Sequence, residues 1–216
     1  MTINSIHLPY PVPYFAQIAS PELAEDIFVH GLDPTLDPRW AESGAKTPEE
    51  YAYWMDRACG IACLKMCTEA LGGPKLSIMD WIRMGLENNG YLIRYDANNK
   101  AEEVGWIHSS LANLARKFGI IAEAKAANES EIIKLLKQGS IVTASVSYEI
   151  GDDRLDITKK GGHLIVIMGA EYDENGPLAF FINNPSGRRK ELQAGARIQI
   201  ERFAPAFSGR IITFQR

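Results

Sequence analysis

Three cysteines fall within nine residues, at Cys59, Cys63 and Cys67, and a cysteine thiolate is a strong nucleophile. Their spacing of four residues places them on one helical face. Cys59 would lie in the first turn, where unpaired N–H groups and the helix dipole favour a thiolate. Its neighbour Gly60 would let a substrate backbone approach closely. We predict Cys59 as a nucleophile, with a small core residue as the alternative, and interpret Cys63 and Cys67 as buried apolar residues.

The same spacing limits metal binding by these cysteines. Eight residues of helix rise about 12 Å, so one ion cannot reach the first and third thiolates at a bond length of about 2.3 Å. We expect no metal site made of all three, whereas a pair with ligands from elsewhere stays open. The odd number of cysteines also argues against a disulfide framework. We expect no cofactor.

A candidate base follows two glycines, in Gly161-Gly162-His163, and precedes an apolar run. A histidine that opens a buried strand lies at a sheet edge, where it can face a cleft and come within about 3 Å of a nucleophile. The remaining histidines lack this setting, since His7 and His30 lie in proline-marked or polar stretches and His108 is expected to cap a helix. We predict His163 as the general base, with a structural histidine as the alternative.

Two polar residues complete the candidate site. Asn184 lies in a turn motif after an apolar strand, and an Asn side-chain oxygen can hold the imidazole tautomer that a base needs. A one-residue shift in strand register would put Asn183 there instead, so both remain open. Gln17 carries a side-chain NH2 group that can donate to a developing oxyanion. The order Gln, Cys at a helix start, His at a strand start and Asn at the next strand end is that of papain-like enzymes.

Helical patterns lead along the chain and strand patterns follow. Apolar spacing and capping residues predict helices over 58–71, 77–89, 108–118 and 128–139. Residues rich in β-branched side chains predict strands over 141–148, 163–170, 178–183, 197–200 and 211–214. This segregation predicts an α+β fold, with N-terminal helices packed on a C-terminal antiparallel β-sheet.

Two segments are predicted as surface structure. Prolines at alternate positions from Pro9 to Pro13 indicate an edge strand or an extended arm. Residues 20–56 are polar and proline-marked, and we interpret them as a surface insertion within a single domain, 1–216. Residues 152–162 are predicted as a loop, whose three aspartates are interpreted as solvated, with attraction of a basic substrate as the alternative.

The composition narrows the function classes. Apolar residues make up 46% of the 216 residues, which is enough for a packed core. The net charge of −4 and the absence of a basic stripe argue against nucleic-acid binding. No apolar run approaches the 18 or so residues of a membrane span, and Met1–Asn4 does not resemble the start of a signal peptide. We expect a cytoplasmic protein, with its oligomeric state open.

Four motifs together resemble the bacteriocin-processing, double-glycine leader peptidases, which form cysteine peptidase family thirty-nine, and in particular their stand-alone peptidase-like relatives. They are Tyr14-Phe15-Ala16-Gln17, Ala58-Cys59-Gly60-Ile61-Ala62-Cys63, Gly162-His163-Leu164-Ile165-Val166 and Asn184-Pro185. The resemblance runs from residue 12 to about 214. It implies a papain-like fold with Gln17 as oxyanion donor, Cys59 as nucleophile, His163 as base and acid, and the residue before Pro185 as the orienting group. The family has Asp at that last position, where this chain has Asn184.

We therefore expect a thiol-dependent hydrolase that cleaves a peptide or isopeptide bond through an acyl-enzyme on Cys59, acting on a peptide or small protein. Two alternatives stay open. One is a transpeptidase that passes the same acyl group to an amine. The other is a non-catalytic peptide-binding module, which the replacement of Asp by Asn184 motivates.

Overall fold

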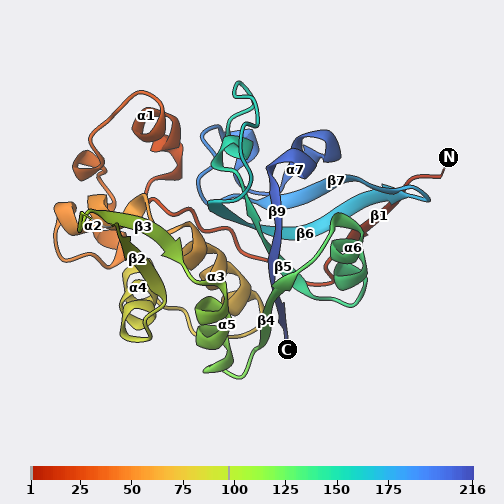
Figure 1. Cartoon of the computed structure of the whole chain (residues 1–216), viewed down its shortest axis with the longest axis horizontal. Coiled ribbons are helices and arrows are strands. Elements are labelled where there is room, and N and C mark those ends of the chain that lie inside the picture. The colour runs from red at the N-terminus through yellow and green to blue at the C-terminus, as the bar shows by residue number, and fades with distance from the viewer. Residues whose placement is uncertain (1, 97) are drawn as a thin grey trace.

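The computed structural model describes residues 2–96 and 98–216, and an antiparallel sheet occupies its C-terminal part (Figure 1). Within the described residues this sheet has seven strands in the order β4-β9-β5-β6-β7-β8, with β1 paired to β6. They are β1 (Asn4–His7), β4 (Ile121–Ala126), β5 (Ile141–Val146), β6 (His163–Asp173), β7 (Gly176–Asn183), β8 (Ala196–Gln199) and β9 (Phe207–Gln215). A separate hairpin consists of β2 (Tyr91–Tyr95) and β3 (Ala101–Trp106).

The helices lie on both faces of this sheet. They are α1 (Ala24–Phe28), α2 (Pro48–Met55), α3 (Cys59–Ala70), α4 (Ile78–Glu87), α5 (His108–Arg116), α6 (Glu129–Lys137) and α7 (Ile200–Ala206). Helix α3 packs on β6 and α5 on β4, whereas α6 packs on β5, β6 and β7. Every residue of β5 is buried, as expected for a strand covered on both faces. The α+β prediction is confirmed.

Helix α3 is the central helix of the helical part (Figure 1). Most of its residues are buried, so the broad apolar stripe faces protein on nearly all sides. Its N-cap residue, Ala58, has no side chain that can cap the first turn. The first-turn N–H groups are therefore left for other partners. At the other end, Gly72 adopts a φ of 79°, and the Gly73 N–H donates to the Thr68 carbonyl at 2.8 Å.

The start of β6 is set by two glycines with left-handed backbone. Gly161 and Gly162 have φ values of 75° and 92°, a region that residues with a Cβ rarely adopt. The Gly161 N–H donates to the Ala206 carbonyl at 3.1 Å, which ties this turn to the end of α7. His163 then pairs with Val146 of β5. The glycine pair thus places His163 at the first position of a buried strand.

Residues 20–56 are more ordered than the sequence indicated. They form α1, α2 and three short 3-10 turns at Pro21–Leu23, Pro34–Leu36 and Trp40–Ser43. A second apolar cluster lies beneath them, made of Ile18, Ala24, Ile27, Tyr51 and Met55. Buried Asp37 accepts hydrogen bonds from the hydroxyls of Ser20 and Tyr51, which closes the segment on itself. Its last helix ends four residues before Cys59.

The predicted helices and strands are present with shifts of a few residues at their ends. Ser77 and Asn128 cap their helices, since their side chains accept from Asp80 N–H and Glu131 N–H. His108 is a correction: it is the first residue of α5, and Ile107 occupies the cap position. Four further features were not predicted from the sequence: β1, the β2–β3 hairpin, β4 and α7. The prolines of residues 9–13 lie in an extended arm that follows β1.

Candidate active site

Cys59 begins α3 and differs from the other two cysteines in its surroundings. It is partly exposed, whereas Cys63 and Cys67 are fully buried. Burial is the largest effect on the Cys59 thiol and raises its pKa. Hydrogen bonding to the backbone N–H groups of Leu164, Gly60 and Cys59 itself opposes this shift and favours the thiolate. The structure thus places Cys59 at the uncapped helix start that the sequence predicted.

Gly60 is closely packed. A Cβ at this position would meet Leu111 and Leu164 side-chain carbons at 3.1 Å and the Trp106 Cβ at 3.3 Å. These contacts join α3 to α5, β6 and β3. Neighbouring side chains therefore occupy the space that a side chain at position 60 would need, and the approach of a substrate backbone stays a prediction.

His163 is held through one of its two ring nitrogens. Its Nε2 lies 2.8 Å from Asn184 Oδ1 and 3.1 Å from Ser186 Oγ. Asn184 Oδ1 also accepts from the Ser186 backbone N–H at 3.1 Å, and this donor fixes which end of the amide is the oxygen. His163 Nε2 must therefore carry the proton and donate it to that oxygen. The Nδ1 lone pair is left as the basic site of the ring.

Asn184 contacts His163, and Asn183 is engaged elsewhere. The Asn183 side chain accepts from the Gly195 N–H at 3.0 Å and donates to the carbonyls of Val12 and Pro13. It fastens the N-terminal arm and does not contact His163. Asn184 is fully buried beside the imidazole. Its Nδ2 has no hydrogen-bond partner among the described residues.

Gln17 lies near the site but is engaged elsewhere. Its Nε2 donates to the Met55 carbonyl at 2.8 Å, and its Oε1 is buried without a partner among the described residues. Its backbone N–H donates to the Pro185 carbonyl at 2.9 Å. The side-chain NH2 retains one hydrogen for an oxyanion, but Gln17 does not line the cavity described below. Gln17 thus links the end of α2, which precedes Cys59, to Pro185, which follows Asn184.

Cys59 and His163 line one cavity of about 870 Å³. Trp106, Gly162 and Leu164 line it beside them, and it extends to the β2–β3 hairpin, the start of α5 and the end of β4. Its volume lies within the range of ligand pockets in proteins. The two predicted chemical groups therefore share a space that can hold a substrate.

Burial favours the neutral forms of both the His163 imidazole and the Cys59 thiol. Burial lowers the pKa of His163 to about 4, with the Asn184 hydrogen bond opposing and the charge of Arg188 adding to the effect. The thiol of Cys59 has a raised pKa for the same reason, as burial disfavours its charged form. The neutral imidazole offers an unprotonated nitrogen at neutral pH, and both pKa shifts oppose transfer of the thiol proton to it.

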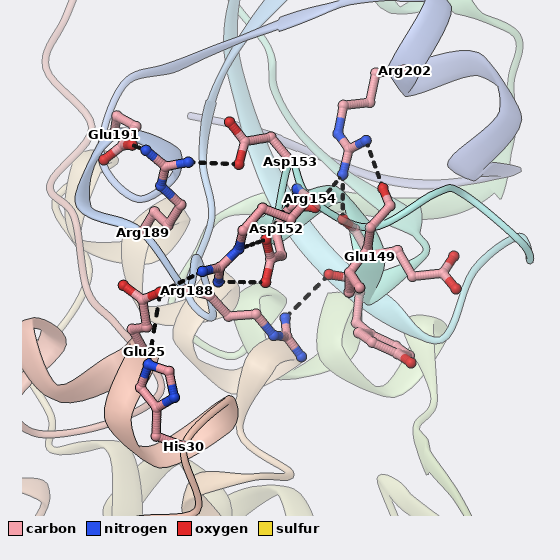
Figure 2. A network of polar contacts seen from close by, with 12 residues as sticks. Glu25, His30, Glu149, Asp152, Asp153, Arg154, Arg188, Arg189, Glu191 and Arg202 are labelled. Atoms are coloured by element: carbon pink, nitrogen blue, oxygen red, sulfur yellow. Dashed lines mark hydrogen bonds and ion pairs between the residues drawn. The ribbon is translucent and has the colours of Figure 1, made fainter.

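A network of charges holds the loops next to the site (Figure 2). Asp152 is buried and bonded to Arg154, which also pairs with Glu25 of α1, while Asp153 pairs with Arg189. Asp152 is therefore buried and paired, which corrects the sequence interpretation for that residue, whereas Asp153 is paired but exposed. The network fixes the segment that follows Asn184 against the loop after β5.

Two residues near His163 escaped the sequence analysis. Ser186 contacts the imidazole directly, as described above, and Arg188 is half-buried between the rings of Tyr148 and Phe28. Both follow Asn184 in a turn motif, and a turn motif by itself carries no sign of the ring it will contact. The Asn184-Pro185-Ser186 run was the available signal.

An antiparallel sheet packed on helices, with a cysteine at a helix start and a histidine at a strand start facing one cavity, is the arrangement of a papain-like cysteine peptidase. A family model described as the peptidase C39-like family matches residues 12–204. The chain belongs to this family, whose members are cysteine peptidases. No significant match was found among curated proteins.

Solved structures with low sequence identity were also found. The peptidase domain of Streptococcus ComA, a bifunctional ABC transporter, is 18% identical, with 74% of this chain and 91% of that chain covered and a TM-score of 0.48. A double-glycine-motif protease from an AMS/PCAT transporter, in complex with the leader peptide, is 15% identical, covering 72% of this chain and 82% of that chain, with a TM-score of 0.39. Within the described residues, no helix is both long and apolar enough to cross a membrane.

Proposed function

We propose that the chain is a thiol-dependent hydrolase that cleaves a peptide or isopeptide bond through an acyl-enzyme on Cys59. The observation that carries this proposal is the shared cavity of Cys59 and His163, combined with the Asn184 contact that leaves His163 Nδ1 basic. Peptide or small-protein substrates fit the family to which the chain belongs.

The reaction begins with transfer of the Cys59 thiol proton to His163 Nδ1. The thiolate attacks the scissile carbonyl carbon, and the uncapped first-turn N–H groups of α3 stabilise the oxyanion that forms. The imidazolium then protonates the leaving amine, and the C–N bond breaks to leave a thioester on Cys59. His163 next takes a proton from water, the hydroxide attacks the thioester, and the thiol leaves with the proton from His163.

Asn184 acts as a positioning residue for His163. Its Oδ1 accepts from Nε2–H, which keeps Nδ1 free of hydrogen and aims the ring. As a neutral amide it stabilises an imidazolium less than a carboxylate would, and the nearby charge of Arg188 also disfavours imidazolium. We therefore expect a slower enzyme than one with Asp at position 184.

Trapping of the acyl-enzyme tests the proposal. The protein would be incubated with an equimolar mixture of acetylated decapeptides of random sequence, quenched in acid, and examined by intact-protein and peptide mass spectrometry. A mass increase on the Cys59 peptide, with cleaved peptides in solution, is expected. The Cys63→Ala variant is the matched control and should keep the adduct. Cleavage that survives Cys59→Ala would contradict the proposal.

A non-catalytic peptide-binding module is the second candidate. It is favoured by Gln17, whose side chain is bonded to Met55 and lies outside the cavity lining. In that case peptides bind the cavity with equal affinity before and after Cys59→Ala, and no cleaved product forms.

If the acyl-enzyme served transpeptidation instead of hydrolysis, added amines would divert the product from acid to amide.

A further inference from the structure

The cavity beyond Cys59 carries a charge opposite to that of the whole chain. Its lining includes Arg57, Arg94, Lys125 and Arg210 but only two acidic residues, Asp56 and Glu103. The chain as a whole has a net charge of −4. A cleft with charge of one sign concentrates ligands of the opposite sign. The cavity therefore favours an anionic ligand.

The cations differ in how far they are already neutralised. Arg57 is bonded to Glu103, and Lys125 lies 3.9 Å from the exposed carboxylate of Glu123. Arg94 and Arg210 form no ion pair with any residue that the structure describes. In the charge network of Figure 2, by contrast, Arg154 is paired with Asp152 and Arg189 is paired with Asp153.

Arg210 is aimed at the cavity by an irregularity in β9. Strand β5 pairs Ala144 with Ile211 and Val146 with Phe207, so the residues 208–210 of β9 lie opposite the single residue Ser145. Gly209 adopts a φ of 77° within this bulge. A bulge bends its strand and redirects side chains. Arg210 also pairs with Ala126 at the end of β4, and both line the cavity.

The strand register gives the distance from the nucleophile. Leu164 packs against Gly60, the residue after Cys59. Leu164 pairs with Ser145, and Ser145 faces the bulge that holds Arg210. Two strand spacings separate Leu164 from that bulge, about 10 Å in all. An extended peptide advances about 3.3 Å per residue, so the bulge lies about three residues from the scissile bond.

We propose that this site selects peptides with a carboxylate about three residues from the scissile bond, bound by Arg210. The inference rests on the proposed function for its reference point, the scissile bond. The carboxylate is either an Asp or Glu side chain or the free C-terminus of the peptide. His108, whose pKa is lowered by burial and by the charge of Arg210, lies near Arg210 and adds no positive charge at neutral pH.

A paired peptide library tests the proposal. Acetylated, C-terminally amidated decapeptides of Ala, Gly, Ser and Leu would carry one Glu, or one Gln as the isostere, at each position in turn. Cleavage sites would be read by mass spectrometry. We expect cleavage of the Glu peptides about three residues from the Glu, on one side only, at about ten times the kcat/KM of the Gln peptides. The same peptides with Gln and a free C-terminal acid distinguish a terminal carboxylate from a side chain.

Charge reversal supplies the second arm. The Arg210→Glu variant should lose the Glu preference and favour peptides with Lys at that position. Arg116→Glu, at the exposed far end of α5, removes an equal charge outside the cavity and should keep the Glu preference. Circular dichroism and thermal unfolding would establish that each variant is folded.

Failure of the inference and failure of the proposed function give different results. Equal cleavage of Glu and Gln peptides by the wild-type protein would overturn the inference and leave the hydrolase proposal standing. If nothing is cleaved, the Cys59→Ala variant and fluorescein-labelled library peptides still report on selectivity by anisotropy. Tighter binding of Glu than Gln peptides, lost on charge reversal, would then uphold the inference without the hydrolase. Equal or absent binding would overturn both.

Discussion

Two regions of α3 carry the same residue type in very different surroundings. Cys59, in the first turn, lines a cavity with His163. Hydrogen bonding to backbone N–H groups of its own helix and of Leu164 favours its thiolate. Cys63, one turn further along, is fully buried, and its thiol pKa is raised well above the ordinary value. The comparison teaches that access and nearby donors, and not the thiol itself, separate a nucleophile from a packing residue.

The largest expected effect is on turnover, and one substitution type tests both regions. Cys59→Ser should lower kcat/KM by at least about 10³-fold, because a hydroxyl is a far weaker nucleophile in a site built for a thiol. Cys63→Ser should change it by less than threefold or so, as Cys63 does not line the cavity. Steady-state cleavage of a peptide found by the acyl-enzyme experiment is the measurement. Equal losses at the two positions would remove the distinction.

Burial of the imidazole should make stability depend on pH. The pKa of His163 is about 4 in the folded chain, against an ordinary value of 6.5. The unfolded chain therefore binds more protons between these values, so stability rises with pH across this window and is lost as pH falls from 6.5 towards 4. The contribution is about 3 kcal/mol. Urea unfolding at pH 7 and pH 4.5 measures it.

The control for this effect is the variant His163→Gln, which cannot titrate. Its free energy of unfolding should change less between the two pH values than that of the wild-type protein. An unchanged pH dependence would mean that the carboxylates of the charge network, and not His163, cause the loss of stability at low pH.

The orienting amide should matter more than its neighbour in sequence. Asn184→Ala removes the acceptor of His163 Nε2–H, so Nδ1 is no longer kept basic, and kcat should fall by about 10²-fold. Asn183→Ala loosens the N-terminal arm and should lower the melting temperature with kcat nearly unchanged. Asn184→Asp should raise the pKa of His163, observed by NMR titration. Similar kcat losses for both alanine variants would show that the loop as a whole is responsible.

The smallest effect reverses the comparison between the two cysteines. Cys63→Ser buries a hydroxyl in an apolar core and should cost about 1–3 kcal/mol of stability. Cys59→Ser places the hydroxyl at the cavity, where water can reach it, and should cost less than about 1 kcal/mol. Denaturant midpoints of the two variants, compared at equal m values, decide the order. A larger loss at position 59 would mean that the first turn is packed as tightly as the middle.

The sequence singled out Cys59 and His163 because each lies at an abrupt change of pattern. Cys59 stands where a polar stretch meets a long apolar helix, and His163 stands between two glycines and an apolar strand. Local pattern is enough for such boundaries. It could not choose between Asn183 and Asn184, because that choice depends on how β7 pairs with β6, a contact between distant parts of the chain.

The elements that escaped prediction share an exposed position. Most residues of β3 are exposed, and β4 lies at the edge of the sheet, so neither shows the apolar alternation of a buried strand. Helix α7 contains Pro205 near its end, which argues against a helix when only the sequence is read. These elements also line the cavity or lie next to it. The sequence therefore indicated the chemistry of the site better than its selectivity.

The rate of Cys59 alkylation tests the central claim most directly. Iodoacetamide labelling at pH 7, followed residue by residue by peptide mass spectrometry, would be compared in the wild-type protein and in His163→Ala. We expect Cys59 to react and Cys63 not to react in the folded protein, with the Cys59 rate falling at least about tenfold in His163→Ala. A Cys59 that reacts no faster than Cys63, or equally fast without His163, would contradict the account.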